Sequence, residues 1–163
     1  MMILKALKFA ENKHEGQKRK VSNEPYISHP IKVSYLLTSF KQSKKIEELI
    51  CAALLHDTLE DTETTFEEIE KEFSPLVASL VFELTSDEAE ILKIGKNNYL
   101  KNKMKNMSSY ALTLKLVDRL ANITDNPKES YRKDTVELLT WLKENRNLNK
   151  TQLKIIESIL REV

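Results

Sequence analysis

The sequence has few of the residues on which several kinds of site depend. Its 163 residues include one cysteine, Cys51, so no disulfide can form within the chain. A lone cysteine in an apolar helical run is most often a small buried residue, and one cysteine fits a reducing cytoplasm. Glycine occurs only at Gly16 and Gly95, whereas glycine-rich phosphate loops and dinucleotide-binding turns need more glycines in fixed patterns. Any phosphate chemistry must therefore rest on a metal ion and on basic side chains.

Long apolar runs and an excess of one charge are missing too. No run approaches the roughly 20 residues that span a bilayer, and Lys5 and Lys8 interrupt the apolar positions that a signal peptide would need. Lysine and arginine number 26 and aspartate and glutamate 25, which leaves a net charge of +1. Bulk electrostatics therefore does not point to nucleic acid or a membrane as a partner. We expect a cytoplasmic protein.

Apolar residues recur with the period of a helix, and strand-like alternation is almost absent. We therefore predict an all-α fold, a single-domain helical bundle over residues 1–163 with roughly eight helices or more. The predicted helices cover about residues 2–13, 30–40, 45–59, 65–72, 75–85, 109–123, 131–145 and 150–162, with a basic helix ending near residue 104. Residues 86–97 are expected to be mostly irregular, although a helix could resume near Glu88. The predicted N-caps are Thr64, Ser74, Ser108 or Ser109, and Asn149.

The most informative stretch is 52–62, where an apolar helix ends in four polar side chains. His56 and Asp57 are of the types that bind a catalytic divalent metal. If the helix continues for one more turn, Glu60 shares a face with His56, and Asp61 with Asp57. A solvated acidic helix end is the alternative, but such an end rarely follows five residues without a polar side chain. We therefore favour a metal site here.

Two other features could complete such a site. His29 precedes Pro30 in a restrained start to a helix, although a cap or a partly buried histidine is the commoner role there. Asp118 and Asn122 are four residues apart on an apolar helix, where the alternative is a buried polar pair. A buried Asp118 needs a cation, which is either Arg119 or a metal shared with the other ligands.

The run 18–20 is basic and lies ten residues before His29. By default it is a solvated charge run, but arginine can also bind phosphate through two hydrogen bonds or stack on a base. Lys93 and Lys96 are weaker candidates for phosphate contacts.

Taken together, these residues resemble a known family. His29, His56-Asp57 and Asp118 follow the order of ligands in the HD-domain metal-dependent phosphohydrolases. The segments 14–20, 25–30, 53–62 and 115–122 are similar to the hydrolase domain of Rel/Spo-type alarmone enzymes. The resemblance covers about residues 3–127, with packing helices over about 131–162, and the chain looks like the small, hydrolase-only members without a synthetase domain.

The resemblance implies a function and a role for each site residue. One divalent metal, typically Mn²⁺, would be bound by His29, His56, Asp57 and Asp118. Glu60 and Asp61 would serve the attacking water and the leaving group, and their closeness should raise the pKa of one of them. Arg19, Lys20 and Asn122 would contact the nucleotide. The substrate would be guanosine tetraphosphate or pentaphosphate, (p)ppGpp, cut at its 3′-pyrophosphate to give GDP or GTP and pyrophosphate.

Two other functions are considered. The chain could be another HD-type enzyme, such as a nucleotidase or an NADPH phosphatase, or a non-catalytic helical module that binds the alarmone. The intact pair Glu60-Asp61 argues against a pure binder. The sequence also departs from the family pattern. Asn23 stands where glycine is usual, although asparagine tolerates a positive φ, and Thr124 stands where arginine is common.

Overall fold

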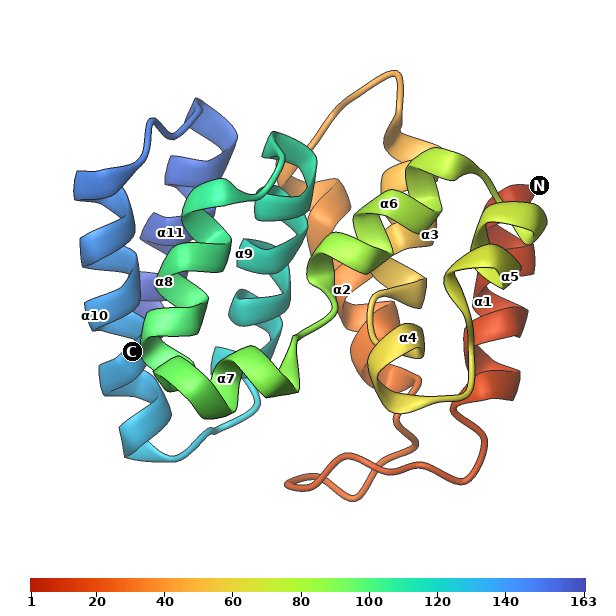
Figure 1. Cartoon of the computed structure of the whole chain (residues 1–163), viewed down its shortest axis with the longest axis horizontal. Helices are drawn as coiled ribbons and strands as arrows, with labels where there is room; N and C mark the ends of the chain where they lie inside the picture. The colour runs from red at the N-terminus through yellow and green to blue at the C-terminus, as the bar shows by residue number, and fades with distance from the viewer. The chain divides into compact units, whose positions relative to one another are not determined.

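The computed structural model describes residues 1–163 and consists of helices joined by connections, of which a long one, residues 14–27, lies between α1 and α2 (Figure 1). It contains helices α1 to α11 and no strand, and its only strand-type pairing is an isolated bridge between Lys18 and Pro25. The predicted all-α class is therefore confirmed. The chain divides into two compact units, Met1–Thr85 and Ser86–Val163. None of its helices combines the length and the apolar character that a membrane span requires.

The first unit is built around α3 (Ile46–Leu55), which packs against α1, α2 and α6. The segment 51–55 of this helix is wholly buried, and burying a leucine side chain such as Leu54 or Leu55 stabilises a fold by about 1.5–3 kcal/mol. The other helices of the unit are α1 (Met2–Lys13), α2 (Ser28–Phe40), α4 (Thr58–Asp61), α5 (Phe66–Glu72) and α6 (Pro75–Leu84). Helix α1 buries Ala6 and Ala10, whereas Leu4 on the same helix is 56% exposed.

The helix predicted over residues 45–59 is wrong at its C-terminal end. It stops at Leu55, and α4 begins at Thr58. The buried hydroxyl of Thr58 donates to the carbonyl of Leu55 at 2.7 Å, so a side chain takes the place of the next backbone bond of the helix. The break leaves His56 and Asp57 at a helix end, which is where adjacent residues can turn toward one point.

A cap was also predicted one residue too early. The N-cap of α5 is Thr65, whose hydroxyl accepts from the backbone N–H of Glu68 at 3.2 Å. Thr64 is buried instead, and its hydroxyl is hydrogen-bonded to that of Thr62 at 2.7 Å. The caps predicted at Ser74, Ser108 and Asn149 are confirmed.

The polar segment between α1 and α2 forms an ordered turn. The backbone N–H of Arg19 donates to the carbonyl of Glu24 at 2.9 Å, and that of Asn23 donates to the carbonyl of Arg19 at 3.0 Å. Asn23 has a φ of 60°, the left-handed region that asparagine tolerates better than most residues. The expectation that asparagine can replace glycine in this turn is therefore confirmed.

The second unit places α9 (Ser109–Ile123) against α11 (Lys150–Glu162). In the same unit α8 (Lys96–Asn106) packs against α7 (Glu88–Ile94) and α10 (Glu129–Asn145). Helix α7 occupies much of the segment that was expected to be mostly irregular and begins at Glu88, where the sequence left a helix open. Asp87 caps it by accepting from the backbone N–H of Glu90. Most residues of α9 are buried, so a polar side chain on this helix needs a partner.

Candidate metal centre

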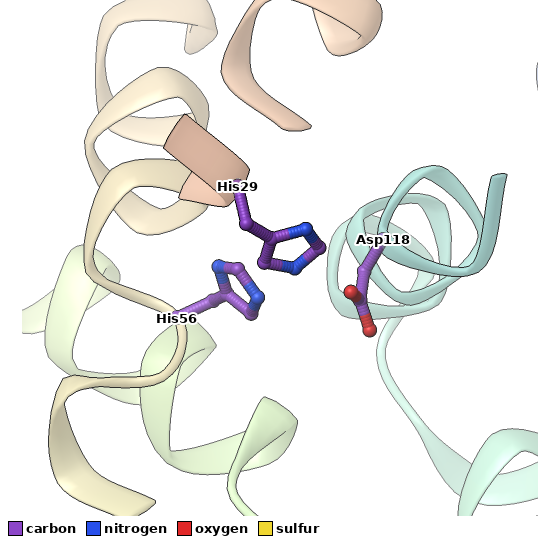
Figure 2. A group of neighbouring side chains, drawn as sticks. All are labelled: His29, His56 and Asp118. Carbon is purple, nitrogen blue, oxygen red and sulfur yellow. The ribbon is translucent and has the colours of Figure 1, made fainter. Parts of the chain in front are cut away.

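Two buried histidines lie side by side in the first unit. His29 is the second residue of α2 and His56 directly follows α3, and each is 3% exposed. Their ring centroids are 5.2 Å apart at an interplanar angle of 61°. Figure 2 shows the two imidazoles next to each other. The buried start of α2 and the break after α3 therefore bring together two residues that are 27 positions apart in the sequence.

The tautomer of His56 follows from its hydrogen bond. Its Nδ1 lies 2.8 Å from the carbonyl oxygen of Ala53, which can only accept. Nδ1 therefore carries the proton in the neutral ring, and Nε2 carries the lone pair. A backbone carbonyl that fixes one ring nitrogen while the other binds a metal is the usual arrangement around metal-binding histidines.

The carboxylate of Asp57 adjoins both rings. Its Oδ2 lies 2.9 Å from Nε2 of His56 and 3.9 Å from Nε2 of His29. The hydroxyl of Tyr26 donates to the same oxygen at 2.5 Å. The first unit thus holds two imidazole nitrogens and one carboxylate oxygen together, with a tyrosine that orients the carboxylate.

The other two carboxylates of the segment 52–62 are on α4. Glu60 and Asp61 are both exposed. Loss of hydration raises the pKa of Asp61 above its ordinary value, and the charges of Asp57 and Glu60 raise it further, while His14 and a hydrogen bond from Tyr26 oppose the shift. One carboxyl of the pair therefore has the raised pKa that the sequence predicted, although dehydration contributes more than the neighbouring carboxylate.

The remaining predicted ligand belongs to the second unit. Asp118 on α9 is buried, and its Oδ1 accepts from the side-chain amide of Asn122 at 2.7 Å. Nζ of Lys115 lies 3.1 Å from its Oδ2. The local cation beside Asp118 is therefore Lys115, three residues earlier on the same helix, and the expectation that it would be Arg119 is wrong.

Arg119 faces a different helix. Its guanidinium donates to the hydroxyl of Thr135 at 2.8 Å and lies 5.2 Å from the ring centroid of Tyr131, both on α10. Successive residues of a helix point about 100° apart, which is why Arg119 and Asp118 serve different neighbours.

The basic residues proposed for the nucleotide lie in the turn before α2. The guanidinium of Arg19 is 5.8 Å from the ring centroid of Tyr26, and Lys20 is exposed. Lys20 therefore projects into solvent, while Arg19 is held on the aromatic ring that also supports Asp57.

Tyr26 and Gln17 are functional candidates that the sequence analysis did not single out. The position of Tyr26, directly after Pro25 and three residues before His29, is the sequence signal that points to it. Gln17 donates from its side-chain amide to the backbone carbonyl of Asp61 at 2.9 Å. That contact spans 44 residues, and no local pattern could have revealed it.

The donor atoms present fit a divalent metal ion. His29 and His56 of the first unit are buried, as is Asp118 of the second, and each of them by itself offers an atom of the kind that binds such an ion. Asp57 adds a further carboxylate beside the two histidines. Mixed imidazole and carboxylate ligands suit Zn²⁺, Mn²⁺ or Fe²⁺ and do not suit the softer ions that prefer sulfur.

A comparison with protein families gives the class. A family described as an HD domain matches residues 6–140, which is most of the chain. The chain therefore belongs to the HD-domain family.

Comparison with individual proteins narrows the class. The chain is 40% identical over 125 residues to the Xenopus tropicalis protein named guanosine-3′,5′-bis(diphosphate) 3′-pyrophosphohydrolase MESH1, and it covers 69% of that protein. It is 39% identical over 151 residues to the Aquifex aeolicus protein named guanosine-3′,5′-bis(diphosphate) 3′-pyrophosphohydrolase, of which it spans only 20%. These matches use 76% and 83% of the chain, respectively.

A solved structure described as a metazoan ortholog of SpoT that hydrolyzes ppGpp is similar with a TM-score of 0.80. The sequence identity is 29%, and the match covers 99% of this chain and 94% of that one. The resemblance to Rel/Spo-type hydrolases, inferred from the motifs, is confirmed.

Proposed function

We propose that this protein is a metal-dependent phosphohydrolase that removes the 3′-pyrophosphate from (p)ppGpp and releases pyrophosphate with GDP or GTP. The observation that carries the proposal is the cluster of His29, His56 and Asp57, in which one carboxylate oxygen lies within 3.9 Å of both imidazole Nε2 atoms. The cluster lies in an HD-domain chain whose relatives are named for this reaction.

The metal would be held by His29, His56, Asp57 and Asp118. Support comes from the donor chemistry and from the tautomer of His56, which directs a lone pair away from Ala53. Two carboxylates and two neutral imidazoles offset the charge of one divalent ion, and we propose Mn²⁺. When bound, the ion supplies Lewis acidity, which lowers the pKa of a bound water and draws charge from a phosphoryl oxygen.

Glu60 and Asp61 are the proposed catalytic carboxylates. They follow Asp57 by three and four residues, on the short helix that the break after α3 creates. The raised pKa of Asp61 suits a group that holds a proton and delivers it to a leaving oxygen, and Glu60 can accept a proton from the attacking water. Both residues are exposed, so a substrate can reach them.

Arg19, Lys20 and Asn122 are the proposed nucleotide contacts. The guanidinium of Arg19 can bind phosphate through two hydrogen bonds while Tyr26 supports its plane. Lys20 adds a positive charge in the same turn. Asn122 is oriented by Asp118, so its side chain would link the nucleotide to a ligand of the metal.

We also propose that both units belong to one hydrolase domain acting in a reducing cytoplasm, because the family match runs from the first unit into the second. The substrate is a nucleotide, and neither a nucleic acid nor a membrane is required for the reaction.

Product analysis of purified protein tests the function. With Mn²⁺ we expect ppGpp to yield GDP and pyrophosphate, and a chelator should stop the reaction. Parallel incubations with NADPH and nucleoside monophosphates test the other HD-type activities. Faster turnover of NADPH than of ppGpp would replace the proposed substrate, and binding of ppGpp without turnover would replace the enzyme by an alarmone-binding module.

Asp57→Ala and Asp61→Asn separate the proposed roles of the carboxylates. Asp57→Ala should lose both Mn²⁺ binding and turnover because it removes a ligand. Asp61→Asn should retain Mn²⁺ binding and lose most turnover because the amide cannot exchange a proton. Full activity of Asp61→Asn would contradict the role assigned to that carboxylate.

A further inference from the structure

We propose that Gln17 is a positioning residue, which sets the place of the catalytic carboxylate of Asp61 by holding its backbone. This inference rests on the proposed function, because it assumes that Asp61 takes part in the reaction. Gln17 lies in the turn after α1, and neither the proposed metal site nor the proposed nucleotide contacts include it.

The contact is a side-chain clamp on the end of a helix. The amide Nε2 of Gln17 donates to the carbonyl oxygen of Asp61 at 2.9 Å. Asp61 is the last residue of α4, a helix of four residues. The last carbonyls of a helix have no partner within it, and a helix this short has little stability of its own. Gln17 therefore supplies a bond that α4 cannot make for itself.

The donors and acceptors allow only one arrangement of this clamp. The carbonyl of Asp61 can only accept, so the NH₂ group of Gln17 must face it and the amide oxygen must face the other way. That oxygen lies 2.8 Å from Nδ1 of His14. Nδ1 must therefore donate, and His14 fixes the orientation of the Gln17 amide.

His14 is itself held firmly. It is 3% exposed, and its ring lies against the ring of Tyr26 with centroids 4.7 Å apart. Tyr26 in turn donates to Asp57. The buried His14 therefore supports two chains of contacts. Through Gln17 it reaches the backbone carbonyl of Asp61, and through Tyr26 it reaches the carboxylate of Asp57.

The backbone of Gln17 is fixed as well. Its N–H donates to the carbonyl of His14 at 3.0 Å, and its carbonyl accepts from Tyr26 at 2.9 Å. Gly16 has a φ of +77°, and this left-handed conformation lets the chain turn back toward α4. The backbone of Gln17 is therefore held by hydrogen bonds to His14 on one side and to Tyr26 on the other.

Loss of the bond between Gln17 and Asp61 should affect the rate of the reaction more than the binding of substrate or metal. A reacting group displaced by about 1 Å can lose roughly a hundredfold in rate, and loss of an orienting partner typically costs about 10- to 100-fold. The hydrogen bonds of the Gln17 side chain go to His14 and to the carbonyl of Asp61, and not to a proposed metal ligand or to Arg19 or Lys20. We therefore expect its loss to lower kcat and to leave KM and the Kd for Mn²⁺ nearly unchanged.

Gln17→Glu tests the clamp in the full chain. Glutamate has the same shape and can still accept from His14, but its carboxylate cannot donate to the carbonyl of Asp61. The matched control is Gln42→Glu, which makes the same charge change at an exposed position of the same unit. Gln17→Met removes both bonds without adding charge and is the second variant.

Both Gln17 variants should lose about 10- to 100-fold in kcat for ppGpp with Mn²⁺, with KM and the Kd for Mn²⁺ within about threefold of those of Gln42→Glu. In the metal-free protein, backbone amides of residues 60–62 should exchange with deuterium faster in the Gln17 variants only. Turnover of Gln17→Glu within twofold of the control would overturn the inference, since the bond to His14 would then be sufficient. A lower kcat together with a higher KM and a lower Tm in both variants would also overturn it, because that pattern indicates that the whole turn has been destabilised.

Failure of the proposed function would be recognised separately. In that case Gln42→Glu and the unmodified protein would not hydrolyse ppGpp, while hydrogen exchange would still report whether Gln17 holds the end of α4.

Discussion

Replacing Tyr26 with phenylalanine should weaken metal binding without removing a metal ligand. The change deletes one hydroxyl, which donates to Oδ2 of Asp57 at 2.5 Å. This oxygen is the one that lies 2.9 Å from Nε2 of His56 and 3.9 Å from Nε2 of His29. Without the hydroxyl, the carboxylate can rotate away from the two rings.

The size of the effect follows from the chemistry of the bond. A hydrogen bond to a charged group contributes about 1.5–3 kcal/mol, and about 1.4 kcal/mol corresponds to a factor of ten in Kd. The side chain of Asp57 is 20% exposed, so water replaces part of the lost interaction. We therefore expect the Kd for Mn²⁺ to rise by about 10-fold to at most about 100-fold, the range seen for groups that orient metal ligands.

Calorimetric titration of metal-free protein with Mn²⁺ measures this change directly. The matched control is Tyr35→Phe, since Tyr35 is 73% exposed on α2. Equal Mn²⁺ affinities of Tyr26→Phe and Tyr35→Phe would refute the reasoning, because Asp57 would then hold its position, or the metal would bind, without help from Tyr26.

Three further outcomes are expected. Asn23→Ala should lower the free energy of unfolding by about 1 kcal/mol, because alanine resists the left-handed φ of 60°, whereas Asn23→Gly should change it by less in urea denaturation. Asp61→Asn should stabilise the metal-free protein at pH 7, because burial and the charges of Asp57 and Glu60 raise the pKa of Asp61 and so disfavour its ionised form. The folded state binds that proton more tightly than the unfolded state, so the difference between variants should shrink as the pH falls through the raised pKa of the folded protein and disappear below 3.8, the ordinary pKa. Cys51 should resist alkylation at pH 8 in the folded protein and react after unfolding, because burial raises the pKa of its thiol to about 12.

Local chemistry predicted most of the helix boundaries. The bounds of α1 and α9 agree with the sequence, and α9 begins at the predicted serine N-cap, Ser108. The capping box at the start of α11 uses Asn149 and Gln152 as the sequence indicates. These features depend on residues within one or two turns of each other, which is the range over which sequence patterns are informative.

The errors arose where a side chain replaced a backbone interaction. The periodicity of apolar residues continues through His56, so it favours an unbroken helix, and only the hydroxyl of Thr58 on the carbonyl of Leu55 reveals the break. The same limit applies to Asp118. A buried carboxylate needs a cation, but the sequence does not determine whether Lys115 or Arg119 supplies it. The choice depends on the direction in which each long side chain points. Arg119 points toward α10 because its guanidinium donates to the hydroxyl of Thr135.

The break after Leu55 also explains how one short segment can serve two purposes. A continuous helix would point His56 and Asp57 about 100° apart, but at the helix end their side chains meet at 2.9 Å. The chain then needs only Thr58 to Asp61 to form a new turn, which carries Glu60 and Asp61 next to the proposed ligands. A turn of four residues has too few internal hydrogen bonds to fix a reacting group to within a fraction of an ångström. A catalytic pair on α4 would therefore need the hydrogen bond from Gln17 to the carbonyl of Asp61. The break that brings the proposed metal ligands together thus also creates the need for a residue that holds the carboxylates in place.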